Sequence, residues 1–180
     1  MPRLFTGLEV PYEVQLGLSL KRGGLLGARW IDPENYHITL CFIGDVDNRV
    51  ADEVSYELDR AAGFDSFRIR LSHLGTFGGD KPRALYAGIE NNEALQRLQA
   101  SHERILRRAG VAADARKFVP HISLARLRGA LPIEVADFIH HAGHFVPLEF
   151  TVRRFVLFSS KNSVGGGPYL VEQSYSLAAA

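Results

Sequence analysis

A four-residue stretch, His37-Ile38-Thr39-Leu40, recurs 84 residues later in the chain as His121-Ile122-Ser123-Leu124. In each copy a histidine and a hydroxyl residue take the first and third positions, and apolar residues take the second and fourth. Side chains alternate between the two faces of a β-strand, so each copy presents imidazole and hydroxyl on one face and buries its apolar pair on the other. The repeat predicts two equivalent strands whose polar faces meet across a pseudo-twofold axis.

The rest of the chain alternates short apolar runs with stretches of helical spacing. Including the two motifs, strands are predicted over 3–10, 36–43, 67–74, 84–89, 119–127, 148–158 and 169–177. Helices are predicted over 91–109 and from Asp47 to Gly63, with weaker ones after Pro11 and Pro132. Gaps such as 75–83 are too short for a helical crossover and imply antiparallel neighbours. We therefore expect an α+β fold.

Length and composition limit the classes of protein to consider. The 180 residues, of which 46% are hydrophobic, suit one domain over residues 1–180 with a sizeable core. Lys and Arg number 21 and Asp and Glu 20, so the net charge of +1 gives no support to polycationic binding of nucleic acids. A local basic site stays open.

Cys41 is the only cysteine, which rules out an internal disulfide, a CxxC redox pair and a Cys-rich zinc site. The first ten residues reach Glu9 before any apolar run long enough for a signal peptide, and no stretch approaches the roughly 20 apolar residues of a membrane span. We expect a cytoplasmic protein that makes no contact with membranes.

The paired motifs suit phosphoryl chemistry. One neutral imidazole can take a proton from an attacking water while the other, protonated, gives one to the leaving oxygen, since imidazole titrates near about 6.5. Two flanking hydroxyls, Thr39 and Ser123, can donate hydrogen bonds to the non-bridging phosphate oxygens. This scheme uses neither a metal ion nor a cofactor, and none is expected.

In its paired motifs the chain resembles the 2H phosphoesterase superfamily, and within it the RNA 2′,3′-cyclic phosphodiesterases, also known as LigT-like 2′-5′ RNA ligases. Besides the two motifs, the resemblance extends over nearly the whole chain. It is carried by Arg3-Leu-Phe-Thr-Gly-Leu8, Arg29-Trp30, Asn35 to Gly44, Leu74-Gly-Thr-Phe-Gly78, Pro82-Arg-Ala-Leu-Tyr86, Phe118 to Arg126 and Phe155-Val-Leu-Phe-Ser-Ser160.

The resemblance implies two pseudo-symmetric lobes of mainly antiparallel sheet, with helices packed outside and an active-site cleft between the lobes. It assigns His37 as the proton donor and His121 as the proton acceptor that activates water. It further implies hydrolysis of a terminal RNA 2′,3′-cyclic phosphate to a 2′-phosphate, with reversible 2′-5′ ligation as an additional activity. The implied partners are RNA or oligonucleotide ends that carry a cyclic phosphate, bound by a monomer.

Two residues five positions after the motif histidines pose a problem of parity. Arg126 is the obvious cation for the phosphate, yet strict alternation from His121 puts it on the buried face with Ile122. Either a bulge or a strand end turns Arg126 towards the cleft, or it makes a structural ion pair. Phe42 has the same parity in the first motif, and we predict that it belongs to the core.

Two other function classes compete with hydrolysis. The same cleft would serve a non-catalytic module that binds 2′-phosphorylated or 2′-5′-linked nucleotides, although intact histidines and hydroxyls favour an enzyme. A metallohydrolase would instead combine His37 and His121 with the cluster of His140, His141 and His144, which lacks an acidic ligand. Insensitivity to EDTA would remove that interpretation.

Two arginines and one further histidine have alternative roles. Arg68 and Arg70 would follow an RNA backbone or, as we prefer, form a solvated face. His102 is predicted to be semi-buried.

Overall fold

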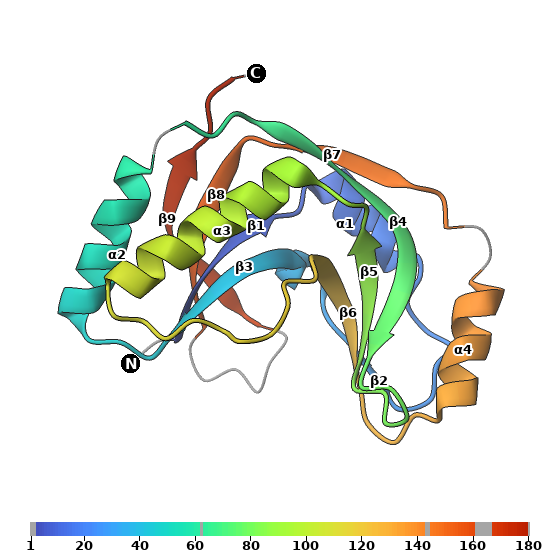
Figure 1. Cartoon of the computed structure of the whole chain (residues 1–180). Helices are drawn as coiled ribbons and strands as arrows, with labels where there is room; N and C mark the ends of the chain where they lie inside the picture. Colours follow the sequence, from blue (N-terminus) through green and yellow to red (C-terminus); the bar gives the residue numbers. More distant parts are fainter. Residues whose placement is uncertain (1–2, 62, 143–144, 161–166, 180) are drawn as a thin grey trace.

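The protein, described by a computed structural model over residues 3–61, 63–142, 145–160 and 167–179, has an α+β fold built on one antiparallel sheet of nine strands. The strand order is β7-β4-β5-β6-β3-β1-β8-β9, and β2 pairs with β6 off this path (Figure 1). The strands are β1 (Arg3–Glu9), β2 (Ala28–Trp30), β3 (His37–Gly44), β4 (Phe67–Phe77), β5 (Ala84–Ile89), β6 (His121–Leu127), β7 (Leu148–Val152), β8 (Arg154–Ser160) and β9 (Tyr169–Ser176). The helices are α1 (Tyr12–Ser19), α2 (Asn48–Arg60), α3 (Glu93–Arg108) and α4 (Pro132–His141), with a short 3-10 helix η1 (Pro33–Asn35).

The two motif strands, β3 and β6, meet at the centre of the sheet. They pair through Ile38 and Ile122, the equivalent second residues of the two motifs. From this point β3, β1, β8 and β9 extend one way and β6, β5, β4 and β7 the other. We call these four-stranded halves the first and second lobes. In each lobe the strand next to the motif strand, β1 or β5, precedes it in the chain.

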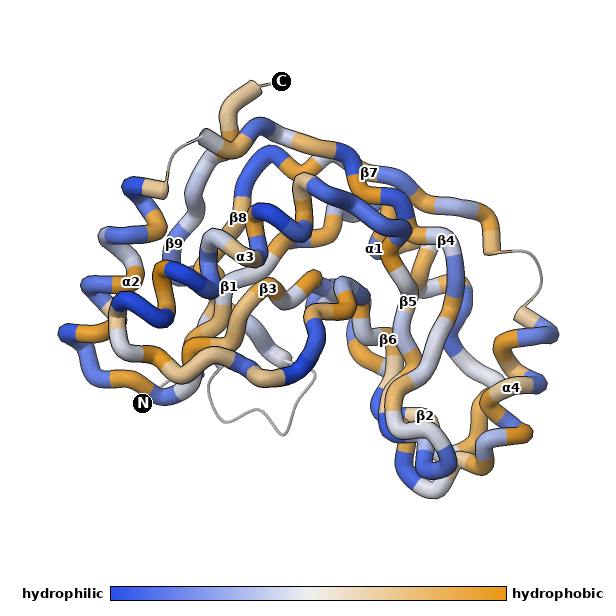
Figure 2. Tube along the Cα trace, viewed as in Figure 1, coloured by the Kyte–Doolittle hydropathy of each residue, from blue (hydrophilic) through white to orange (hydrophobic). Residues whose placement is uncertain are grey.

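The apolar faces of the central strands form the core. Ile38 and Ile122 are fully buried and belong to one cluster with Leu95 and Leu98 of α3. Figure 2 shows hydrophobic and hydrophilic residues alternating around α2 and α3, so each helix turns one side to the core and one to water. α2 and α3 lie on the first lobe, and α1 contacts β7 of the second.

Side-chain caps explain where the two long helices begin. Asp47 accepts a hydrogen bond from the backbone N–H of Val50 at 2.8 Å, and Asn92 accepts one from that of Leu95 at 2.9 Å. α1 follows Pro11, and α4 starts at Pro132 itself. All four predicted helices are therefore present.

The structure departs from the predicted strands in two places. The predicted strand 148–158 is two strands, because β7 pairs with β4 in the second lobe and β8 pairs with β1 in the first. The apolar run thus continues while the chain passes from one lobe to the other. β2 is not among the predicted strands; it has only three residues and pairs with the end of β6.

Candidate active site

Each motif histidine is oriented by the backbone two residues before it. The Nδ1–H of His37 donates to the carbonyl oxygen of Asn35 at 2.9 Å, and that of His121 donates to the carbonyl oxygen of Val119 at 2.6 Å. A carbonyl oxygen can only accept, so in both neutral rings the proton lies on Nδ1 and Nε2 carries the lone pair. Nε2 of His37 lies 3.0 Å from the hydroxyl oxygen of Thr39. The two halves thus present equivalent imidazoles with the same tautomer.

Both motif strands carry a β-bulge at the same place. Thr6 and Gly7 on β1 pair with Cys41 and Thr39, which leaves Leu40 as an extra residue in β3. On β5, Leu85 and Tyr86 pair with Ala125 and Ser123, which leaves Leu124 as an extra residue in β6. A bulge shifts the alternation by one residue and re-aims the side chains that follow it. The repeat therefore extends from the motif residues to the backbone irregularity behind them.

Because of the bulges, strict alternation of side chains does not hold for Phe42 and Arg126, the residues five positions after the motif histidines. Arg126 is exposed, on the face of His121 and Ser123, while Leu124 and Ala125 are both buried. Phe42, predicted to belong to the core, has 56% of its surface exposed because the bulge at Leu40 turns it the same way. The prediction for Phe42 is wrong, and of the two alternatives for Arg126 the bulge is present.

Aromatic rings surround the two imidazoles. The His37 ring centroid lies 5.2 Å from that of Phe5, 5.5 Å from Phe158 and 4.7 Å from Tyr169. The His121 ring lies 4.8 Å from Phe77 and 5.3 Å from Tyr86. Phe158 and Phe77 have equivalent places, since they pair with Phe5 and Ala84 on the strands next to β3 and β6.

Burial lowers the pKa of both histidines below the ordinary 6.5, because a charged imidazolium loses its hydration in these surroundings. The hydrogen bonds to the carbonyl oxygens of Asn35 and Val119 act in the opposite direction, since they favour the charged ring. The charge of His121 lowers the pKa of His37 further. A charge on His121 therefore disfavours a second charge on His37.

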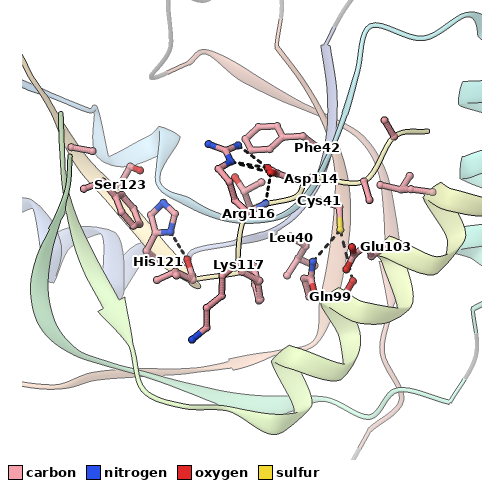
Figure 3. Close-up of a pocket in the computed structure, with 18 of the residues that line it drawn as sticks. Leu40, Cys41, Phe42, Gln99, Glu103, Asp114, Arg116, Lys117, His121 and Ser123 are labelled. Carbon is pink, nitrogen blue, oxygen red and sulfur yellow. Dashed lines mark hydrogen bonds and ion pairs between the residues drawn. The ribbon is translucent and has the colours of Figure 1, made fainter. Parts of the chain in front are cut away.

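A cavity of about 650 Å³ opens beside the motifs. Thr39, His121 and Ser123 line it, and Figure 3 shows the His121 ring and Ser123 on one wall with Phe42 on another. Arg83 also borders this cavity. His37 is not among its lining residues, and both histidines are half-buried. Of the two imidazoles, His121 is the one that lines this cavity.

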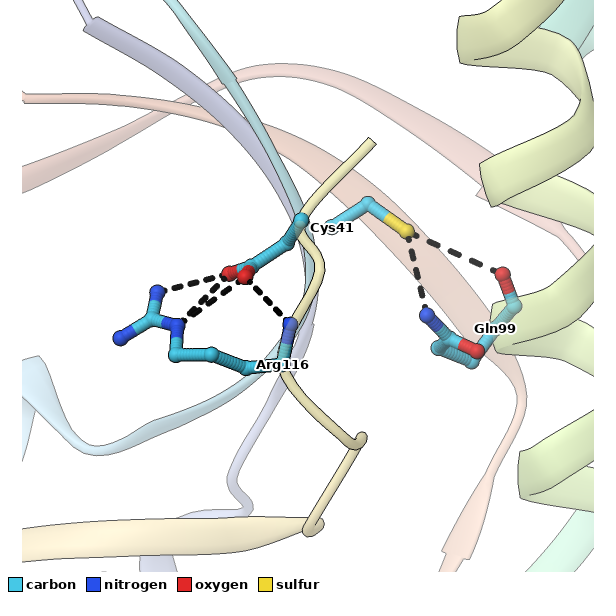
Figure 4. A network of polar contacts seen from close by, with 4 residues as sticks. Cys41, Gln99 and Arg116 are labelled. Atoms are coloured by element: carbon cyan, nitrogen blue, oxygen red, sulfur yellow. Dashed lines mark hydrogen bonds and ion pairs between the residues drawn. The ribbon is translucent and has the colours of Figure 1, made fainter. Parts of the chain in front are cut away.

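The loop between α3 and β6 lines this cavity. Figure 4 shows two sets of polar contacts here, one within the loop and one between β3 and α3. The Arg116 guanidinium donates from Nη2 to the Asp114 carboxylate at 2.6 Å, which lowers the pKa of Asp114 to about 2. Behind the loop, the Cys41 thiol donates to the backbone carbonyl of Gln99 at 3.7 Å and accepts from its side-chain amide at 3.6 Å. Burial raises the pKa of Cys41 to about 12, so this thiol is not a nucleophile.

The remaining candidate residues lie away from the cavity. Arg68 pairs with Glu149, and Arg70 pairs with Glu149 and Glu90, so both arginines belong to a solvated face of β4.

Among the residues that the structure describes, no group of three His, Cys, Asp or Glu side chains could hold a metal ion. His140 and His141 end α4, and His144 lies outside the described residues. No helix in the described ranges is long and apolar enough to cross a membrane.

His102 is fully buried rather than semi-buried. Its Nδ1 lies 2.9 Å from the Thr6 hydroxyl, and its ring lies edge-on to Phe155. Burial lowers its pKa to about 3.

Some residues of the site were not predicted from the sequence. They are Phe77, Tyr86 and the Asp114–Arg116 pair. For the two aromatic residues, the only signal was the family-like segment from Leu74 to Tyr86.

Comparisons with known proteins identify the family of this chain. A family model described as the 2′-5′ RNA ligase superfamily matches residues 28–163. A Thermotoga maritima protein named RNA 2′,3′-cyclic phosphodiesterase is 33% identical over 177 residues, covering 94% of this chain and 92% of its own length. An Archaeoglobus fulgidus protein of the same name is 30% identical over 86% of this chain and 89% of its own.

Solved structures show the same fold. The crystal structure of the Thermus thermophilus protein TT0787 is 26% identical, with a TM-score of 0.79 over 98% of both chains. The crystal structure of E. coli LigT complexed with 3′-AMP has a TM-score of 0.79 at 24% identity, over 98% of this chain and 99% of that one. At that identity the second likeness concerns the fold alone.

Proposed function

This chain belongs to the 2′-5′ RNA ligase superfamily, and we propose that it hydrolyses the terminal 2′,3′-cyclic phosphate of RNA to a 2′-phosphate by paired histidine acid–base catalysis. The observation that carries the proposal is the matched orientation of the imidazoles. Both Nδ1–H groups donate to a backbone carbonyl oxygen, so in both neutral rings Nε2 carries the lone pair, and that of His37 lies beside the Thr39 hydroxyl. The relatives named RNA 2′,3′-cyclic phosphodiesterase support the substrate and the reaction.

We assign the role of general base to His121 and that of general acid to His37. His121 lines the open cavity, where water can reach its Nε2, and it takes a proton as that water attacks phosphorus. The bond from phosphorus to the ribose 3′ oxygen breaks, and His37 gives its Nε2 proton to that oxygen. The product keeps the phosphate on the 2′ oxygen, and each histidine ends in the protonation state in which the other began.

We assign the binding of the phosphate to the hydroxyls of Thr39 and Ser123. Each lies two residues after its histidine on the same strand face, on a wall of the cavity. Donation to the non-bridging oxygens would stabilise the charge that gathers there in the transition state. Arg126, turned to the same face by the bulge, supplies a cation at the rim of this site. A 5′-hydroxyl in place of water would give the 2′-5′ linkage of the ligation reaction.

The proposal predicts an acidic optimum for the free enzyme. In the productive form one histidine is protonated at Nε2 and the other is not. The pKa of both histidines is lowered from 6.5. We expect kcat/KM to peak below pH 6.5 and kcat, which reports the complex, to peak at higher pH, because a bound phosphodiester anion favours imidazolium. Initial rates over a pH range of about 4.5 to 9 measure both profiles. A kcat/KM optimum above about pH 7 would contradict the acid–base assignment to this pair.

The decisive experiment incubates the purified protein, in EDTA, with an oligoribonucleotide that ends in a 2′,3′-cyclic phosphate, and identifies the product isomer. We expect a 2′-phosphate, and a loss of about 10²- to 10⁴-fold in His37→Ala and in His121→Ala, with thermal unfolding as a control for folding. Tight binding without turnover would identify a binding module instead. Turnover that appears only with added metal would identify a metallohydrolase.

A further inference from the structure

A second cavity, of about 300 Å³, lies beside the active site at the end of β6. Arg29 and Arg126 both line it. We propose that these two arginines form a second anion subsite, which binds the phosphodiester preceding the reactive end of an RNA strand and makes an oligonucleotide a better substrate than a cyclic mononucleotide. This inference rests on the proposed function, and it names the form of RNA that the site selects.

Strand pairing places the two arginines side by side. Arg29 on β2 is the direct antiparallel partner of Arg126 on β6, so both side chains leave the same face of the sheet. That face is the one of His121 and Ser123, because the bulge at Leu124 restores Arg126 to it. The neighbouring Trp30 packs against Phe138. β2 therefore has one apolar anchor and one exposed cation.

Two like charges directly opposite each other on paired strands repel, and an anion bound between them would offset that repulsion. Forked guanidinium groups are suited to a phosphate, which each can bind through two N–H groups. Two acidic residues, Asp32 and Glu34, line the same cavity. Asp32 lies 3.6 Å from Arg22, whose charge offsets its own. Glu34 lines the cavity without an ion pair among those of the described residues, and its negative charge should weaken the binding of a phosphate there.

The subsite lies at a suitable separation from the reactive centre. Counting the bulge as one position, Arg126 is two positions beyond Ser123 on β6, about 6.6 Å at roughly 3.3 Å per residue. On its other side Arg126 pairs with Ala84, which lines the main cavity, whereas Arg29 is one strand further away. Arg126 thus lies between the two cavities. Arg29 is placed to contact the next phosphate along the strand and not the reactive one.

The test compares two substrates that share a terminal nucleoside: adenosine 2′,3′-cyclic phosphate, and a trinucleotide that ends in the same group. For Arg29→Ala we expect KM for the trinucleotide to rise about tenfold at unchanged kcat, and no change for the mononucleotide. Arg29→Lys, which keeps the charge, should recover part of the loss, and Glu34→Gln should lower KM for the trinucleotide. Arg97→Ala, an exposed arginine of α3, is the matched control.

Equal losses on both substrates, or none on either, would overturn the subsite. An equilibrium titration with nucleoside 2′-phosphate and with a trinucleotide ending in 2′-phosphate tests it independently of turnover. Arg29→Ala should weaken trinucleotide binding alone and reduce the slope of log affinity against log salt by about 0.7. If the wild type hydrolyses neither substrate, the proposed function fails, and this titration still decides the subsite: an unchanged slope would refute it.

Discussion

Phe42 in the first lobe and Arg126 in the second occupy equivalent positions, each five residues after a motif histidine and each turned outward by a bulge. The backbone, the histidine tautomer and the hydroxyl position are repeated between the lobes, but this last residue is an aromatic ring in one and a cation in the other. The site is therefore symmetric at the histidines and hydroxyls and asymmetric beside them. A nucleotide has the same asymmetry, because a flat base lies on one side of the ribose and the phosphate backbone continues on the other.

The lobes also differ on their buried side. Thr6 on β1 and Leu85 on β5 are equivalent, since they pair with Cys41 and Ala125. Leu85 is packed in an apolar cluster, whereas Thr6 bonds to the buried His102, whose Nε2 has no partner among the described residues. The first lobe thus holds a titratable group in its core, and the second has an apolar residue at the same place.

The largest effect that we expect is acid destabilisation through His102. Its pKa is about 3 in the folded chain and about 6.5 when unfolded, so the unfolded state binds more protons between these values. Its contribution is fully present above about pH 6.5, and roughly 1.4 kcal/mol is lost per pH unit below that. Urea unfolding from about pH 7 to 4.5 measures the slope, which His102→Gln should reduce. His73→Gln, on an exposed histidine, is the control, and equal slopes in the two variants would contradict the assignment.

The next effect separates the two hydroxyls. We expect Thr39→Val and Ser123→Ala each to lower kcat by about 10- to 100-fold, because each removes one donor to the non-bridging oxygens. Only the Thr39 hydroxyl is also bonded to Nε2 of a histidine, His37, among the contacts of the described residues. Thr39→Val should therefore move the pH profile of kcat/KM as well, and Ser123→Ala should not. Identical shifts in both variants would mean that the two hydroxyls have the same role.

A smaller effect tests the asymmetry itself. Phe42→Ala should raise KM about fivefold for a cyclic nucleotide, by loss of base stacking worth about 1 kcal/mol, and leave KM unchanged for baseless ribose 2′,3′-cyclic phosphate. Arg126→Ala should raise KM for both, and more strongly at low salt. Steady-state kinetics at two ionic strengths measures both variants. If Phe42→Ala affects the baseless substrate equally, the aromatic position does not read the base.

The sequence predicted the site more fully than the outline of the sheet. The motifs located both histidines and both hydroxyls on the same strand faces, because alternation holds over the three residues from His to Thr or Ser. It fails from the next residue, Leu40 or Leu124, where no Gly or Pro marks the bulge. Phe42 was assigned to the core for that reason, and Arg126 could not be placed. Contacts between distant segments, such as β2 with β6 or Thr6 with His102, leave no local pattern from which to predict them.

The smallest effect concerns the one difference inside the motifs, Ser123 where the first copy has Thr39. Ser123→Thr should change kcat by less than about twofold, because the hydroxyl stays and the added methyl only restricts χ1. Ser123 lines the cavity, as Thr39 does. Kinetics with the cyclic mononucleotide measures it. A tenfold loss would show that the second lobe holds its hydroxyl in a rotamer that threonine cannot take, so that the repeated strands position the phosphate in different ways.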